Sequence, residues 1–137
     1  ETSGYAPATV FREIVALTDL VLFDLKLMDE AKHKQYTGVS NGKILENLNY
    51  LCVSGKAFII RIPLIPEVND NEANMLAVLK AIRGATSLLR VELMPYNKFA
   101  GAKYPMLGQT FAPPFDVAKA PNVINVFEKH DIKTVVL

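Results

Sequence analysis

Short apolar runs alternate with helix-length segments along the chain, and this alternation constrains the fold more than any other feature. Continuous runs rich in Val, Leu, Ile and Phe predict strands buried on both faces, at residues 20–25, 57–62, 88–94 and 133–137. The segments between them carry apolar residues at helical spacing and predict helices at residues 7–17, 29–36, 40–55, 70–83 and 121–129. Strands separated by helix-length crossovers indicate a parallel sheet. We expect one α/β unit over residues 1–137, a partial (half) TIM-like (β/α) barrel with parallel strands.

Capping and turn residues predict where these elements begin and end. Asp29, Ser40 and Asp70 stand where a helix N-cap is expected, and Pro63 and Pro95 stand where the second and third strands are expected to end. Residues 96–115 contain glycine and proline and show no clear period. Loops of this length in a compact domain are usually functional or disordered.

The composition excludes several classes of protein. Fifteen Lys and Arg balance fourteen Asp and Glu, so no basic surplus indicates nucleic-acid binding. The single cysteine, Cys52, excludes an internal disulfide framework and fits a reducing, cytoplasmic compartment. No apolar run reaches the roughly 18 residues of a membrane span, and no signal peptide is recognisable. The chain does not begin with Met, so we expect it to be a piece of a longer protein.

Polar residues gather where the predicted strands end. Asp24 and Lys26 close the first strand, Arg61 ends the second, and Glu1 and Thr2 precede the first helix. In parallel α/β folds these carboxyl ends form the binding face. A carboxylate, an ammonium and a guanidinium there suit a zwitterionic ligand such as an amino-acid moiety. The alternative is that Asp24 and Lys26 form only an internal ion pair, because buried charges are usually paired.

Five segments together resemble one family. They are ETSGY at 1–5, DLVLFDLK at 19–26, HKQYTGVSN at 33–41, RIPLIPEVND at 61–70 and VELMPY at 91–96. In this order and spacing they resemble the glycyl-radical-enzyme activating enzymes, the radical S-adenosylmethionine family that includes pyruvate formate-lyase activating enzyme. The resemblance spans the whole chain.

The resemblance implies an activity that needs more than this chain. Such enzymes cleave S-adenosylmethionine at a [4Fe-4S] cluster, and the 5′-deoxyadenosyl radical abstracts hydrogen from a glycine of a pyruvate formate-lyase-like partner. Their C-x-x-x-C-x-x-C motif lies upstream of the segment that matches Glu1, and Cys52 alone cannot hold a cluster. We therefore expect the C-terminal portion of an activating enzyme, lacking the cluster-binding part and inactive by itself, with no catalytic residue of its own.

The resemblance also implies a monovalent cation site. The positions that match Glu1, Thr2 and Asp24, with the carbonyl of Leu22, hold such a cation beside the methionine carboxylate. Hard oxygen ligands suit a cation of this kind.

The expected S-adenosylmethionine contacts are Thr2, Asp24, Lys26, Arg61 and Asn97. Asn97 stands where many members have His, and unlike His it cannot titrate.

Glu67 is a second departure, since it replaces the usual Gly of the loop. Both departures indicate a divergent subfamily.

Two other functions remain open. The chain can be a stand-alone, non-catalytic half-barrel that binds a small ligand or a partner protein. An aldolase-like enzyme with Lys26 as a Schiff base is less favoured, because the adjacent Asp24 raises the lysine pKa. His33 and His130 are expected on helix surfaces or ends. Because an open barrel edge exposes unpaired backbone groups, we also expect self-association or a covering segment there.

Overall fold

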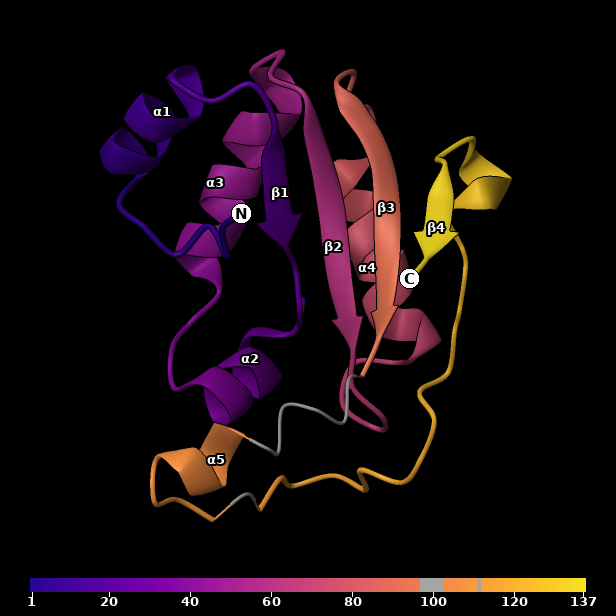
Figure 1. Ribbon diagram of the computed structural model, residues 1–137. Coiled ribbons are helices and arrows are strands. Elements are labelled where there is room, and N and C mark those ends of the chain that lie inside the picture. The colour runs from indigo at the N-terminus through magenta and orange to yellow at the C-terminus, as the bar shows by residue number, and fades with distance from the viewer. Residues whose placement is uncertain (97–102, 111) are drawn as a thin grey trace.

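The computed structural model describes residues 1–96, 103–110 and 112–137, which alternate between helices and strands as the sequence predicts (Figure 1). In chain order the elements are α1 (Ala8–Ala16), β1 (Val21–Asp24), α2 (Glu30–Thr37), α3 (Gly42–Val53), β2 (Phe58–Leu64), α4 (Glu72–Ile82), β3 (Leu88–Pro95), α5 (Lys103–Met106), the 3-10 helix η2 (Glu128–His130) and β4 (Thr134–Val136).

The four strands form one parallel sheet in the order β1-β2-β3-β4. Thr2 extends the sheet by one isolated parallel bridge to Phe23 of β1. Its N–H donates to the carbonyl of Leu22 at 2.9 Å, and its carbonyl accepts from the N–H of Asp24 at 2.9 Å. This parallel, helix-crossed sheet confirms the predicted α/β partial barrel.

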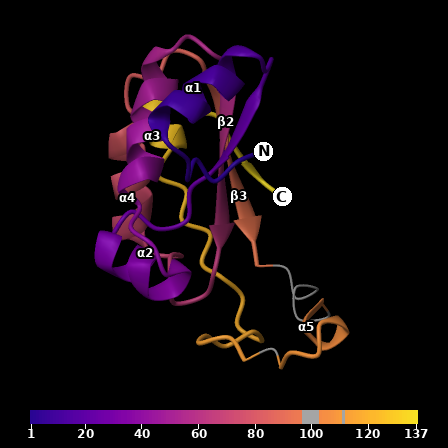
Figure 2. The ribbon, with the colours of Figure 1, turned by 90° about the vertical axis from the view of Figure 1, so that its left-hand side faces the viewer.

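The helices α1, α3 and α4 cover one face of the sheet, as Figure 2 shows edge-on. The alternate strand residues that face them are buried in one apolar core, among them Phe23, Ile60 and Leu93 at 0% exposure. The residues between them on each strand point to the opposite face, which no described helix covers. That face includes Asp24 and Arg61, so the charged strand residues lie on the open side of the sheet.

The capping residues differ in detail from those predicted. Asn71, and not Asp70, is the N-cap of α4, and its side chain accepts from the N–H of Asn74 at 3.0 Å. Asp70 instead accepts from the N–H groups of Glu67 and Asn122, which ties the β2–α4 loop to a distant part of the chain.

Pro63 does not end the second strand, because β2 continues to Leu64. The carbonyl of Arg61 accepts from the N–H of Leu25, so the backbone groups of Arg61 face β1. Those of Pro63, two residues later, face the same side, but there β1 has already ended at Asp24. The proline therefore removes no ladder hydrogen bond.

Two predictions about surface and helix were wrong. His33 is buried at 4% exposure, because α2 turns it toward Thr37 and the carbonyl of Val39, which lies 2.8 Å from its Nδ1. The helix predicted over residues 121–129 is reduced to η2 at its end. The apolar stripe predicted over residues 7–17 is buried only at Phe11 and Val15, and Leu17, the C-cap of α1, is 89% exposed.

In the described part of the chain, no helix is both long enough and apolar enough to cross a membrane.

Candidate functional site

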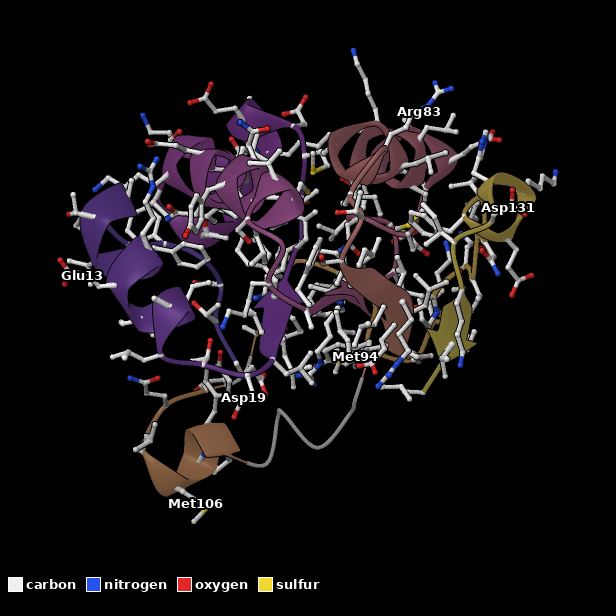
Figure 3. All side chains as sticks on the ribbon, turned by 90° about the horizontal axis from the view of Figure 1, so that it is seen from above. Glu13, Asp19, Arg83, Met94, Met106 and Asp131 are labelled. Carbon is white, nitrogen blue, oxygen red and sulfur yellow. The ribbon has the colours of Figure 1, made fainter. Side chains whose placement is uncertain are left out.

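Three charged residues form a row across the open face of the sheet. Asp24 of β1 is in register with Arg61 of β2, and Arg61 is in register with Glu92 of β3. Residues in register on neighbouring parallel strands point to the same side. Figure 3 views the molecule from above, and in it the labelled Met94 lies on this side of the sheet, away from the helices. The row therefore places alternating charges across the sheet, at the last residue of β1 and in the middle of β2 and β3. The prediction that Arg61 ends the second strand was wrong, because β2 continues to Leu64.

Arg61 is the centre of this row. Its Nη1 lies 2.7 Å from Oε2 of Glu1, and its Nε lies 3.6 Å from Oε2 of Glu92. Its Nε also contacts the sulfur of Met94 at 3.2 Å. Glu92 is further held by Arg90, whose Nη2 lies 2.6 Å from Oε1. The guanidinium, with its side chain 16% exposed, is thus oriented by carboxylates on two sides.

Asp24 and Lys26 do form an ion pair, but a loose one. The distance from Nζ of Lys26 to Oδ2 of Asp24 is 3.5 Å, and the lysine side chain is 39% exposed. The other carboxylate oxygen, Oδ1 of Asp24, is buried and has no hydrogen-bond partner among the described residues. A buried acceptor without a donor is uncommon in folded proteins and costs about 1–3 kcal/mol, more when charged.

The turn at the start of the chain lies against the end of β1. Thr2 Oγ1 accepts from the N–H of Gly4 at 3.0 Å, while the carbonyl of Leu22 accepts from the N–H of Thr2. Each of these two oxygens keeps a second lone pair. Glu1 does not join them through an observed contact, because its Oε2 pairs with Arg61. Of the predicted cation ligands, the structure thus brings Thr2, Leu22 and Asp24 together by backbone pairing.

A pocket of about 260 Å³ opens beside this turn. Its lining is mostly apolar and includes Leu25 and Ile44, together with the polar residues Ser3, Asp24, Lys26, His33 and Thr37. The buried His33 therefore belongs to the wall of this pocket, a role that its position on a predicted helix surface did not indicate.

Buried asparagines hold the segment that follows β1. Asn69 donates to the carbonyls of Lys26 and Pro63, at 2.8 and 2.7 Å. Asn74 accepts from the N–H of Met28 at 2.9 Å. Neither residue was among the predicted site residues. Asn74 stands among the inward apolar residues of a helix. A polar amide at such a position is a sequence signal for a buried hydrogen bond.

Asn97, the remaining predicted contact of S-adenosylmethionine, lies outside the described residues.

An iron–sulfur cluster does not fit the residues described. They include no group of three or more His, Cys, Asp or Glu side chains that could hold a metal ion. Cys52 lies on α3, where its sulfur is 3.9 Å from the carbonyl of Ala81, and burial raises the pKa of its thiol. A cluster needs several thiolates, so the described residues offer no site for one.

The arrangement suits an amino-acid group better than a redox centre. The guanidinium of Arg61 and the ammonium of Lys26 can hold a carboxylate, and the free oxygen of Asp24 can accept from an ammonium or bind a cation.

No family model matches the chain, but several curated proteins are similar to it. The choline trimethylamine-lyase activating enzyme of Oleidesulfovibrio alaskensis is 36% identical over 111 residues, which cover 79% of this chain and 36% of that protein. The pyruvate formate-lyase 2-activating enzyme of Escherichia coli is 34% identical over 112 residues, covering 82% of this chain and 38% of that protein. The chain thus spans little more than a third of the length of these relatives.

Solved structures share the fold. A domain of a pyruvate-formate lyase-activating enzyme from Bacteroides vulgatus has a TM-score of 0.71 at 21% identity and covers 98% of this chain and 78% of that one. A radical SAM methyltransferase from Sphaerobacter thermophilus has a TM-score of 0.61 at 22% identity, covering 99% of this chain and 38% of that one.

The fold and the matches over about four fifths of the chain agree with the motifs at the strand ends. The chain belongs to the family of glycyl radical enzyme activating enzymes.

Proposed function

We propose that this chain supplies the S-adenosylmethionine half-site of a radical activating enzyme, as the C-terminal portion of that enzyme. In the whole protein, S-adenosylmethionine and a [4Fe-4S] cluster would supply the radical that abstracts hydrogen from a glycine of a pyruvate formate-lyase-like partner. The cluster would be held by a part of the enzyme other than residues 1–137. The chain alone would therefore be inactive.

The observation that carries this proposal is the unpartnered Oδ1 of Asp24. It is a buried carboxylate oxygen at the carboxyl end of a parallel strand, where ligands of this fold bind. Two further oxygens, Oγ1 of Thr2 and the carbonyl of Leu22, lie in backbone segments paired with it. Either the ammonium of the methionine group or a monovalent cation would satisfy this oxygen.

Arg61 would receive the carboxylate of the methionine group. The 2.7 Å contact from its Nη1 to Glu1 supports this role, because a carboxylate already fits the guanidinium at that point. Glu1 is 58% exposed in its side chain and can move aside. Lys26, whose ion pair with Asp24 is long and partly exposed, would contribute a second positive charge. Asn97 would complete the set of contacts.

The first experiment measures ligand binding and stability on the same variants. S-adenosylmethionine is titrated into the 137-residue chain, with binding followed by NMR chemical shifts and unfolding by thermal melts. For Asp24→Asn, Lys26→Met and Arg61→Met, losing one charge-assisted contact should cost about 1.5–3 kcal/mol of binding, a ten- to hundredfold loss of affinity. The controls Asp19→Asn and Lys34→Met remove exposed charges elsewhere and should bind like the parent chain.

A structural role for the pair predicts the opposite result. If Asp24 and Lys26 were only a buried ion pair, removing one partner would destabilise the fold by about 3–5 kcal/mol. A large loss of melting temperature with unchanged affinity, or no saturable binding by the parent chain, would refute the half-site.

A second experiment tests inactivity of the isolated chain. The chain is reconstituted with iron and sulfide, reduced and assayed for 5′-deoxyadenosine. Neither cluster absorbance nor product is expected, because Cys52 is its only cysteine. A stoichiometric cluster with turnover would overturn the assignment of the cluster to another part of the enzyme.

A further inference from the structure

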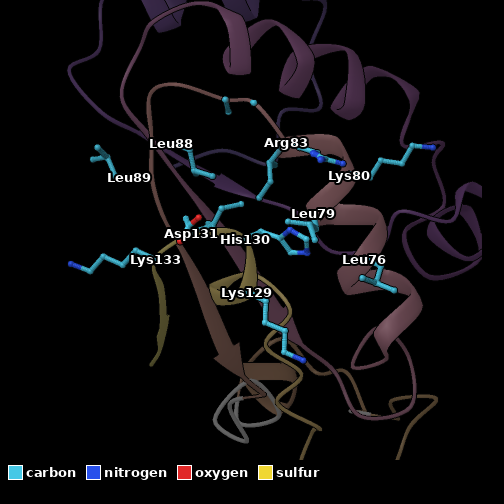
Figure 4. Close-up of a pocket in the computed structure, with 14 residues that line it drawn as sticks. Leu76, Leu79, Lys80, Arg83, Leu88, Leu89, Lys129, His130, Asp131 and Lys133 are labelled. Atoms are coloured by element: carbon cyan, nitrogen blue, oxygen red, sulfur yellow. The ribbon is translucent and has the colours of Figure 1, made fainter.

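A groove of about 640 Å³ lies at the end of the sheet opposite the candidate site (Figure 4). One wall is the side of α4, the other is η2 with the residues that lead into β4, and the amino end of β3 closes it. Its lining includes Leu88 at the start of β3 and Lys133 just before β4, whereas Asp24 is the last residue of β1 and is in register with Arg61 in the middle of β2. A molecule bound in this groove would leave the candidate site open.

The floor of the groove is apolar and partly exposed. Leu76 of α4 is 47% exposed and Leu89 of β3 is 49% exposed. Leu79, which is buried, and Leu88 also line the groove. Exposed leucines that share one groove, unlike single exposed leucines, indicate a contact surface.

The rim of the groove is strongly cationic. Lys80, Arg83, Lys129 and Lys133 line it, and the only carboxylate among the lining residues is Asp131. Among the residues that the structure describes, none of these four cations has a hydrogen bond or an ion pair with another side chain. Since the whole chain carries a net charge of only +1, the groove concentrates positive charge well beyond the average of the molecule.

The shape of the groove suits a helix. Leu76 and Lys80 lie one turn apart on one side of α4, and Arg83 follows at its C-cap, so the groove runs along that helix. The crossover from β2 to β3 places α4 on this face, whereas the described part of the crossover from β3 to β4 contains only α5 and η2 as helical segments. Parallel crossovers usually contain an α-helix packed on the sheet beside its neighbour.

We propose that this groove docks an acidic amphipathic helix of a partner protein. Leucine-type residues of that helix would contact Leu76 and Leu89, and its acidic residues would lie against the cationic rim. In Figure 4 the amines of Lys80, Lys129 and Lys133 point away from one another, which suits charges spread along a helix better than a single phosphate group. The proposal is independent of the proposed function.

The test uses the 137-residue chain and a fluorescent peptide of roughly 18 residues, about 27 Å when helical. The peptide carries Leu at i, i+4 and i+7 on one face and Glu on the other. We expect saturable binding by anisotropy that weakens with added salt. Lys129→Glu with Lys133→Glu should weaken it at least about tenfold, as should Leu76→Ser. The matched controls, Lys32→Glu with Lys34→Glu and Leu17→Ser, should bind like the parent chain.

Other results would overturn the proposal. A peptide of the same composition with its leucines dispersed around the helix should not bind, and equal binding would show mere charge attraction. No binding by any peptide, tighter binding to phosphatidylglycerol vesicles, or a dimer that Leu76→Ser dissociates in sedimentation would each contradict it. Leu76 is half exposed, and circular dichroism melts of every variant would show whether the fold is retained.

Discussion

Two successive crossovers of the same sheet are built very differently. The crossover from β2 to β3 contains α4, an eleven-residue helix with a side-chain N-cap at Asn71 and the fully buried Met75 on its inner side. The crossover from β3 to β4 is longer, yet its described helical segments are the four residues of α5 and the three of η2. The same sheet face is thus covered by a regular helix in one place and by an irregular segment in the other.

The sequence of the second crossover explains the difference. Pro105, Pro113, Pro114 and Pro121 are half of the eight prolines of the chain, and proline interrupts helix hydrogen bonding. In the last part of it, Asn125 accepts from the N–H of Phe127 at 3.1 Å, a local bond that competes with helix formation.

Specific contacts nevertheless tie this segment to the core. Phe127 is fully buried, and Asp70 accepts from the N–H of Asn122 at 2.8 Å. A segment can therefore be integrated into a fold through a few anchors rather than through a regular element.

Removing one buried aromatic ring from the regular part of the sheet and one from the second crossover should lower the free energy of unfolding equally. Phe58→Ala in β2 and Phe127→Ala in the second crossover each delete a fully buried side chain, which should lower the free energy of unfolding by about 3–5 kcal/mol. Urea denaturation measures both. Leu107→Ala, in the same crossover but 74% exposed, should stay within about 0.5 kcal/mol of the parent. A loss below about 1 kcal/mol for Phe127→Ala would show that the segment is not anchored.

Two glycines with positive φ should respond unequally to alanine. At Gly4 (φ 71°) a Cβ would lie 2.4 Å from Cζ of Phe23, whereas at Gly108 (φ 67°) it would meet nothing within 4 Å. Gly108→Ala should cost only the left-handed strain, about 1–2 kcal/mol. Gly4→Ala adds overpacking and should cost about 2–4 kcal/mol. Equal melting temperatures for the two variants would contradict the close packing of the N-terminal turn on β1.

Removing a capping side chain should matter more where a full helix follows. Asn71→Ala removes the N-cap of α4 and should cost about 1 kcal/mol. Asn125→Ala removes a bond that supports only three helical residues and should cost less, about 0.5 kcal/mol. Thermal melts of both variants show which one loses more stability. A larger loss for Asn125→Ala would mean that η2, and not α4, depends more on its side-chain hydrogen bond.

The smallest effect should be a pH dependence at Cys52. Burial between α3 and α4 raises the pKa of this thiol above its ordinary value of 9.0, so in the folded state the proton is held more tightly than in the unfolded chain. The stabilising contribution is complete below pH 9.0 and is lost as pH rises through the folded pKa. Stability of the parent chain relative to Cys52→Ala should therefore fall slightly above pH 9.0. A flat difference would show that the thiol is solvated.

Most of the first 95 residues could be predicted from sequence because local and tertiary preferences agree there. An apolar run such as residues 20–25 is buried as a central strand, and an apolar stripe such as that of α3 is buried by packing one side of a helix on the sheet. The predicted helix over residues 121–129 failed because its apolar residues include β-branched Val123 and Ile124, beside asparagines that bond locally. Of this stretch only Phe127 is buried, on an irregular backbone, while Val123 is exposed.

That the predicted site residues contact S-adenosylmethionine stays a prediction, but the structure shows which of them lie together. Asp24 and Lys26 form the ion pair that their spacing indicated, whereas Arg61, predicted to end its strand, lies in the middle of β2. That Glu92 and Glu1 flank Arg61 depends on strand register and on the N-terminal turn, which no local pattern specifies.

The parallel sheet has a consequence for the order in which the chain folds. Every strand pairing joins residues on either side of a whole crossover, so each must first close a long loop, and such topologies fold slowly. The pairing of β3 with β4 spans the longest crossover and aligns only three residue pairs, from Val91 with Thr134 to Leu93 with Val136. Because this pairing forms the fewest strand contacts for the longest loop that must close, it should form last. In native-state hydrogen exchange, the amide of Leu137, bonded to the carbonyl of Leu93, should therefore exchange long before those between β2 and β3.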